Sequence, residues 1–155
     1  MNAPNPLATV ELSFSALPAH VRTARLVAAA VARRSGVDEM VLDEVRLAVG
    51  EACSRAVDLH RRHCPVELVR VRLTDDADAF LVEVRDLAPV TQGSPDPLEA
   101  LAAAAEIEEV DPDALSGVGL AVISGLVDDL RVEQGAGERG TAVVMAWPAG
   151  PATRR

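Results

Sequence analysis

The chain has 155 residues, of which 49% are hydrophobic and only 2% aromatic. This length suits a single domain with one aliphatic core. Acidic residues outnumber basic ones by 24 to 15, and the net charge of −9 argues against general nucleic-acid binding, because phosphate contacts need a basic surface. The charge fits a protein partner with a basic face, or an acidic surface that only faces water.

The cysteines and the apolar segments indicate a reducing, aqueous compartment. Cys53 and Cys64 belong to no Cys-x-x-Cys motif and are predicted to be free thiols. Residues 1–7 lack the charged and apolar regions of a signal peptide, and the longest strongly apolar helical segment, 26–32, is too short to span a bilayer. We therefore expect a cytoplasmic protein that does not bind a membrane. A less favoured alternative is a structural zinc site with the ligands His60, His63 and Cys64.

The first part of the chain predicts one strand and two helices. Apolar and polar residues alternate over 10–16, which is typical of a half-buried strand. Pro18 then opens a helix that we expect to run to about residue 35, because Gly36 follows as a helix-ending residue. A second helix is predicted over about 38–60, since apolar residues recur there at helical spacing. These residues are Val41, Val45, Ala48, Ala52, Ala56 and Leu59.

The middle of the chain predicts a hairpin and then a helical segment. Strands at 69–74 and 80–85 are joined by an acidic turn at 75–78, which indicates an antiparallel pair with one face in water. The strand patterns stop over 89–116. Within that segment Asp96-Pro97-Leu98-Glu99 combines a capping residue, a proline at the first helical position and a following glutamate, so a helix is predicted to start there.

A third main helix is predicted at 119–127, followed by strands at 129–134 and 141–148 on either side of a glycine-rich turn. The order of elements predicts an α+β fold, a two-layer sandwich with a mostly antiparallel sheet and helices on one face. We expect one domain at 8–148, with disordered tails before it and at 149–155.

Four short patches follow one another along these elements. They are Glu51 in the second helix, Asp86-Leu87-Ala88-Pro89 at a strand end, Gly117-Val118-Gly119 before the third helix, and Gly140-Thr141 before the last strand. Their order and spacing resemble the nucleotide pocket of the histidine-kinase-like (GHKL) ATPases, and within them the small anti-sigma factor kinases of partner-switching systems. The resemblance covers about residues 8–148 and implies the Bergerat-type ATPase fold, an ATP pocket and control of transcription through protein partners.

Asp86 is the residue of these patches that says most about the site. It shares a strand face with apolar residues, so we expect its carboxylate on the helix-covered side, where a buried charge needs hydrogen-bond donors. The resemblance implies that this carboxylate accepts a hydrogen bond from the adenine amino group. The alternative is an aspartate that caps the turn before Pro89. The family usually carries a glycine soon after this aspartate, whereas Leu87 and Ala88 stand here and are expected to crowd the pocket.

The glycines of the last two patches suit close approach of a ligand to the backbone. Backbone N–H groups at a helix start, with no side chain in the way, bind phosphate oxygens. The resemblance therefore places Gly117 and Gly119 at the phosphates, and Gly140 with the Thr141 hydroxyl near the base. Each glycine by itself is also explained as an ordinary turn residue.

Glu51 and Arg55 bear on whether the protein can transfer a phosphoryl group. They lie four residues apart, on one face of the predicted helix. The resemblance implies that Glu51 is the general base toward an acceptor serine, and that an asparagine which coordinates magnesium belongs where Arg55 stands. A guanidinium has no lone pair to offer a cation. Arg55 can instead pair with Glu51 or contact phosphate oxygens directly, and a solvated helix face with one intrahelical ion pair is the plain alternative.

The segment 89–116 corresponds to the mobile lid over the nucleotide in the resembling fold. It is acidic from Asp96 to Asp113 and contains no Arg or Lys, so a lid of this composition repels a triphosphate. A surface helix that contacts a partner explains the segment equally well.

Three functions follow from these residues. The favoured hypothesis is an anti-sigma factor-like regulator that binds a sigma factor or an anti-anti-sigma (STAS-domain) protein, forms a homodimer through its first strand, and has weakened or lost the binding of ATP and magnesium. The second is an active ATP-dependent serine kinase that phosphorylates an anti-anti-sigma factor. The third is a sensor domain that binds another small ligand in the altered cavity.

Overall fold

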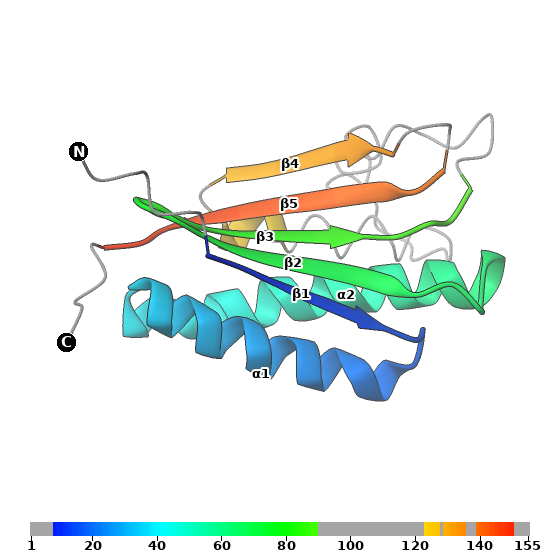
Figure 1. The fold of residues 1–155 in the computed structure, drawn as a ribbon, viewed down its shortest axis with the longest axis horizontal. Helices are drawn as coiled ribbons and strands as arrows, with labels where there is room; N and C mark the ends of the chain where they lie inside the picture. The colour runs from blue at the N-terminus through cyan, green and yellow to red at the C-terminus, as the bar shows by residue number, and fades with distance from the viewer. Residues whose placement is uncertain (1–7, 90–122, 128, 136–138, 151–155) are drawn as a thin grey trace, which may run out of the picture.

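The computed structural model describes residues 8–89, 123–127, 129–135 and 139–150. Within them five strands form one sheet in the order β1-β2-β3-β5-β4, and every neighbouring pair is antiparallel (Figure 1). The strands are β1 (Ala8–Phe14), β2 (Val69–Asp76), β3 (Ala79–Arg85), β4 (Asp129–Gln134) and β5 (Thr141–Pro148). Apolar and polar side chains alternate most regularly along β2 and β3, because these strands bury one face and expose the other.

Two long helices precede the hairpin of β2 and β3. The first, α1 (Pro18–Ser35), begins with proline at its first position and ends at Gly36, whose left-handed φ of 91° closes the helix. A short 3₁₀ turn, η1 (Glu39–Val41), then leads into α2 (Leu42–His63). The side chain of Asp38 accepts a hydrogen bond from the Met40 backbone N–H, which caps that turn.

Both helices pack against the same face of the sheet, where each contacts β2 and β3 (Figure 1). The core between the two layers is almost entirely aliphatic: alanines of α1 and α2 meet valines and leucines of the strands. Phe80 stacks on Trp147 with ring centroids 6.1 Å apart, and the Trp147 indole N–H donates to the carbonyl oxygen of Leu126 at 3.2 Å. The predicted α+β sandwich, with helices on one face of an antiparallel sheet, is therefore confirmed.

Several element boundaries differ from the prediction. The second helix was predicted to begin near 38, but a 3₁₀ turn occupies 39–41, and α2 continues three residues past His60 to His63. The first strand was predicted over 10–16, whereas β1 ends at Phe14. Ala149 and Gly150, predicted as the start of a tail, donate backbone hydrogen bonds to Asp78 and Gly36.

Other predictions fall on residues that the structure does not describe. They are the tails at 1–7 and 151–155, the helix expected after Asp96, and most of the third main helix, of which 123–126 is helical as predicted. None of the helices in the described ranges is long and apolar enough to cross a membrane.

Candidate functional site

The site is centred on an ion pair between the middle of α2 and the end of β3. Arg55 Nη1 lies 3.4 Å from Asp86 Oδ2, and the two side chains are only 11% and 2% exposed. Asp86 directly follows β3, on the helix-covered side of the sheet, and this burial agrees with its place in the alternating strand pattern. The donors that a buried carboxylate requires are thus supplied from inside the protein.

Asp86 makes further contacts that fix the strand end. Its Oδ1 accepts from the Ala88 backbone N–H at 3.0 Å, and its own backbone N–H donates to the Thr141 carbonyl oxygen at 3.0 Å. Burial raises the pKa of Asp86, while the charge of Arg55 and the hydrogen bond from Ala88 oppose that rise. The carboxylate is therefore both a turn cap and the partner of Arg55.

Arg55 is held in an equally dry environment. Burial lowers the pKa of its guanidinium, and Asp86 opposes this change through its charge and its hydrogen bond. Arg55 Nε is buried and makes no hydrogen bond with the residues that the structure describes. Burial is thus the first cause of the pKa change on both partners, and it disfavours the charged form of each.

Glu51 lies one turn before Arg55 on α2 but does not pair with it. Its side chain is partly buried, and among the described residues it makes no hydrogen bond or ion pair. The intrahelical pair that the sequence left open is therefore not formed, because Arg55 reaches across to the sheet instead. Within the described part of the chain, the Glu51 carboxylate therefore has no partner.

Gly140 brings the start of β5 against the end of β3. Its φ is 82°, and a Cβ at this position would lie 2.2 Å from the Asp86 carbonyl oxygen, so only glycine fits. Its N–H donates to the Ala88 carbonyl oxygen at 2.8 Å. Thr141, the next residue, is buried. Gly140 and Thr141 therefore lie beside Asp86, whereas Gly117 and Gly119 lie outside the described residues.

His60 is a member of this site that the sequence analysis considered only as a zinc ligand. It is fully buried, its Nδ1–H donates to the Glu67 carbonyl oxygen at 3.0 Å, and its Nε2 accepts from the Leu87 backbone N–H at 2.9 Å. A backbone N–H can only donate, so Nε2 must be the unprotonated nitrogen. The imidazole thus joins α2, the connection to β2 and the turn after Asp86.

The spacing of α2 contains the signal that would have placed His60. The buried positions Val49, Cys53 and Val57 recur every four residues along this helix, and His60 continues the same face. His63, by contrast, is exposed. Across the ranges that the structure describes, no group of three His, Cys, Asp or Glu side chains is placed to hold a metal ion.

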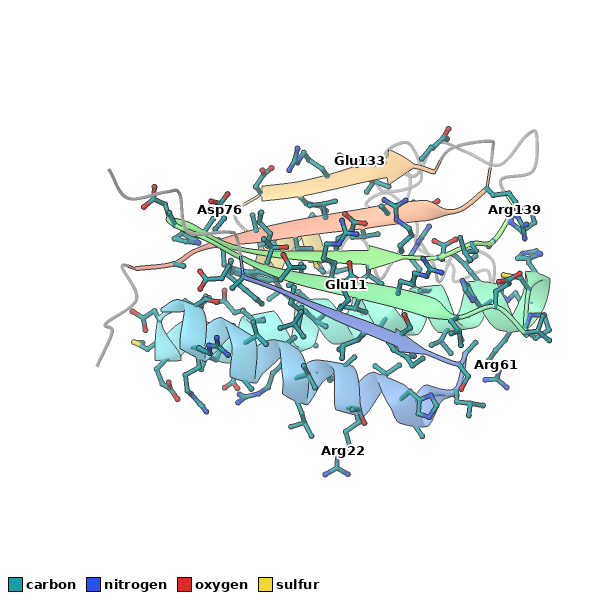
Figure 2. The ribbon with its side chains drawn as sticks, in the orientation of Figure 1. Glu11, Arg22, Arg61, Asp76, Glu133 and Arg139 are labelled. Carbon is teal, nitrogen blue, oxygen red and sulfur yellow. The ribbon has the colours of Figure 1, made fainter. Side chains whose placement is uncertain are left out.

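The α2 end and the turns around Asp86 lie at the same end of the molecule. Arg61 of α2 and Arg139, the residue before Gly140, both lie there (Figure 2), and Arg139 forms an isolated antiparallel bridge with Pro89. The Asp86 and Gly140-Thr141 patches thus meet near this end of the two-layer sandwich.

An antiparallel sheet with an acidic strand end facing a long helix is consistent with an ATPase-like domain of the GHKL class. The model of the histidine kinase-like ATPase domain matches residues 14–147. The chain therefore belongs to the histidine kinase-like ATPase family. No curated protein matches it at a significant level.

Proposed function

We propose that this protein is an anti-sigma factor-like regulator that acts by binding protein partners, and that its nucleotide pocket no longer supports magnesium-dependent phosphoryl transfer. The partners we infer are an anti-anti-sigma (STAS-domain) protein, a sigma factor, or both. The single observation that carries the proposal is the buried ion pair between Arg55 and Asp86.

The residues of the site do not fit adenine well. The carboxylate that an adenine amino group would use already accepts from Arg55 and from the Ala88 N–H. Leu87 and Ala88 occupy the positions after it, and Ala88 is buried. A nucleotide would have to break the pair and leave a buried guanidinium without its counter-charge, which is costly.

The residues do not fit magnesium either. Arg55 stands where the family resemblance calls for an oxygen ligand, and a guanidinium offers five N–H donors and no acceptor. Its positive charge repels a divalent cation at the same place. Phosphoryl transfer depends on neutralising the phosphate charge, so we derive no transfer step for this site.

One observation favours the second candidate function, an ATP-dependent serine kinase. Glu51 has no partner in the described part of the chain, so its carboxylate is available to act as a general base. The kinase function needs Arg55 to leave Asp86, and it is therefore kept as the alternative.

Calorimetry with Mg-ATP on the full chain separates the two functions. We expect no binding in the sub-millimolar range for the wild type. Arg55→Asn should improve binding, because it frees Asp86 and restores an oxygen ligand at the metal position. Arg33→Asn, which alters an exposed arginine on α1 paired with Glu39, serves as the matched control and should change nothing. Sub-millimolar, magnesium-dependent binding by the wild type would overturn the proposal.

The regulatory role has its own test. We expect a tagged full-length chain to retain its sigma-factor or anti-anti-sigma partner in a pull-down carried out without nucleotide. If partner retention requires ATP, the binding function depends on a working pocket and the proposal fails. We further propose that the chain forms a homodimer in solution through β1, which is an edge strand of the described sheet; sedimentation of a monomer at all concentrations would contradict this.

A further inference from the structure

The outward face of the sheet carries a groove that the nucleotide pocket does not involve. Both long helices cover the opposite face (Figure 1). The groove has a volume of about 570 Å³ and runs across β1, β2 and β3. Glu11, labelled in Figure 2, belongs to its β1 side. The polar side chains that line the groove are Glu11, Ser13, Arg70, Arg72, Glu83 and Arg85.

Two of the three arginines in the groove are paired. Arg72 Nε donates to Glu11 Oε1 at 3.1 Å on the neighbouring strand. Arg85 binds Glu83 on its own strand, with Nε and Nη2 at 3.1 and 3.0 Å from the same carboxylate oxygen. These contacts leave each of the two carboxylates with one bound guanidinium.

Arg70 is the exception. It is exposed and makes no hydrogen bond or ion pair with the described residues. In the sheet register it lies directly opposite Arg85 on one side and Ser13 on the other. Like charges directly opposite each other destabilise an antiparallel pair. The sheet therefore places two guanidinium groups, those of Arg70 and Arg85, next to each other without a favourable interaction between them.

The chemistry of this row points to an anionic ligand group. Guanidinium groups bind carboxylates through two parallel hydrogen bonds, and a hydroxyl such as that of Ser13 can donate a third. An oxyanion placed over Arg70 would supply the counter-charge that Arg70 lacks, and it would also lie beside Arg85, which already binds Glu83. The two glutamates in the next row, together with the net charge of −9, would repel a polyanion such as nucleic acid, so a short segment with a few carboxylates fits better.

We propose that this groove is a docking surface for an acidic segment of a protein partner, whose carboxylates bind Arg70 and Arg85. The inference rests on the proposed function only in taking the ligand to be a protein. It predicts that the docking segment is acidic where it crosses β2 and β3, although this chain is itself acidic overall.

A labelled synthetic peptide of alternating serine and glutamate is the probe, because alternate residues of an extended chain face the same side. Fluorescence polarisation with the full chain should show saturable binding that weakens as salt is added. Arg70→Gln should weaken binding by about tenfold or more, the loss expected for one charged hydrogen-bonding group. Arg33→Gln, on the helical layer, should bind like the wild type, and a peptide with glutamine in place of glutamate should not bind.

Three results would overturn the proposal. They are equal peptide binding by the wild type and Arg70→Gln, equal binding of the two peptides by the wild type, and sedimentation showing that Arg70→Gln weakens peptide binding only because the variant no longer self-associates. Arg70→Gln should also be no less stable than the wild type in denaturant, because it removes a like-charge pair; a clear loss of stability would make Arg70 structural and would equally refute the docking role. Failure of these peptide tests leaves the calorimetric and pull-down tests of the proposed function unaffected.

Discussion

Removing both charges of the Arg55–Asp86 pair should not harm the fold. The perturbation is the double substitution Arg55→Leu with Asp86→Asn, which keeps an acceptor for the Ala88 N–H. Burial is the first cause of both pKa changes, downward for Arg55 and upward for Asp86. The pair joins through a single contact of 3.4 Å, and Arg55 Nε has no hydrogen bond. Both directions mean that burial disfavours the charged form of each partner, and the contacts of the pair compensate for it only in part.

The expected magnitudes follow from that balance. Charge-free replacements of buried pairs are often neutral or stabilising by about 1–4 kcal/mol, so the double variant should be at least as stable as the wild type at neutral pH. Arg55→Leu alone leaves a carboxylate that is only 2% exposed without its cation. It should cost about 3 kcal/mol, the low end of the range for a broken buried pair, since the carboxyl can take up a proton instead. Domains of this kind are stable by about 5–15 kcal/mol in total, so this cost is readily measured.

The assay is urea unfolding followed by fluorescence of Trp147, the only tryptophan of the chain, which is 2% exposed and stacked on Phe80. Because the folded pKa of Asp86 is raised, the folded state binds a proton more readily than the unfolded chain. Wild-type stability is then favoured at acidic pH and lost as pH rises through the raised pKa. The difference in free energy of unfolding by which the wild type is less stable than the double variant should therefore shrink as the pH falls from neutral. A double variant less stable than the wild type by more than about 1 kcal/mol, or a deficit independent of pH, would refute the reasoning.

Three further predictions concern the surroundings of the pair. His60→Ala should lower the free energy of unfolding in urea by about 3 kcal/mol, because it leaves the Leu87 N–H and the Glu67 carbonyl oxygen without partners. His60→Gln should restore part of this loss. Equal losses for the two variants would contradict the explanation by hydrogen bonds. Gly140→Ala should cost about 2 kcal/mol or more from its positive φ and the contact with the Asp86 carbonyl, and a melting temperature equal to the wild type would contradict this. Burial raises the pKa of Cys53 to about 12. In a variant that lacks Cys64, a thiol reagent at mildly alkaline pH should therefore label Cys53 only as fast as the protein unfolds. Immediate labelling would contradict this, because it would show that the folded protein exposes the thiol.

The fold was predictable because its signals are local. Pro18 and Gly36 mark the two ends of α1, and both bounds are as predicted. The strand at 129–134 was likewise placed at its observed bounds. The start of α2 was misplaced because Asp38 caps a 3₁₀ turn, and a capping aspartate looks the same in sequence before a 3₁₀ turn as before an α-helix.

The candidate site was predictable only in part. The strand pattern placed the Asp86 side chain on the covered face, and the structure brings Gly140 and Thr141 beside it. The partner of Arg55 could not be deduced from spacing, since Glu51 is four residues away on the same helix while Asp86 is separated from Arg55 by 31 positions. An arginine side chain is long enough to reach either, and burial against the sheet decided between them.

The pairing of Arg55 with Asp86 has a consequence for how the pocket could be altered. The family resemblance implies two separate contacts with a nucleotide, a metal ligand at the position of Arg55 and an adenine-binding carboxylate at Asp86. Here the side chain that stands at the first of these positions pairs with the carboxylate at the second. Under the proposed function, one residue would account for the loss of both magnesium and adenine, because a guanidinium offers no acceptor to a cation and this one also pairs with the carboxylate expected to bind the base. A change at Arg55 alone should therefore affect both halves of nucleotide binding, whereas a change at Asp86 alone should leave the metal position as unfavourable as before.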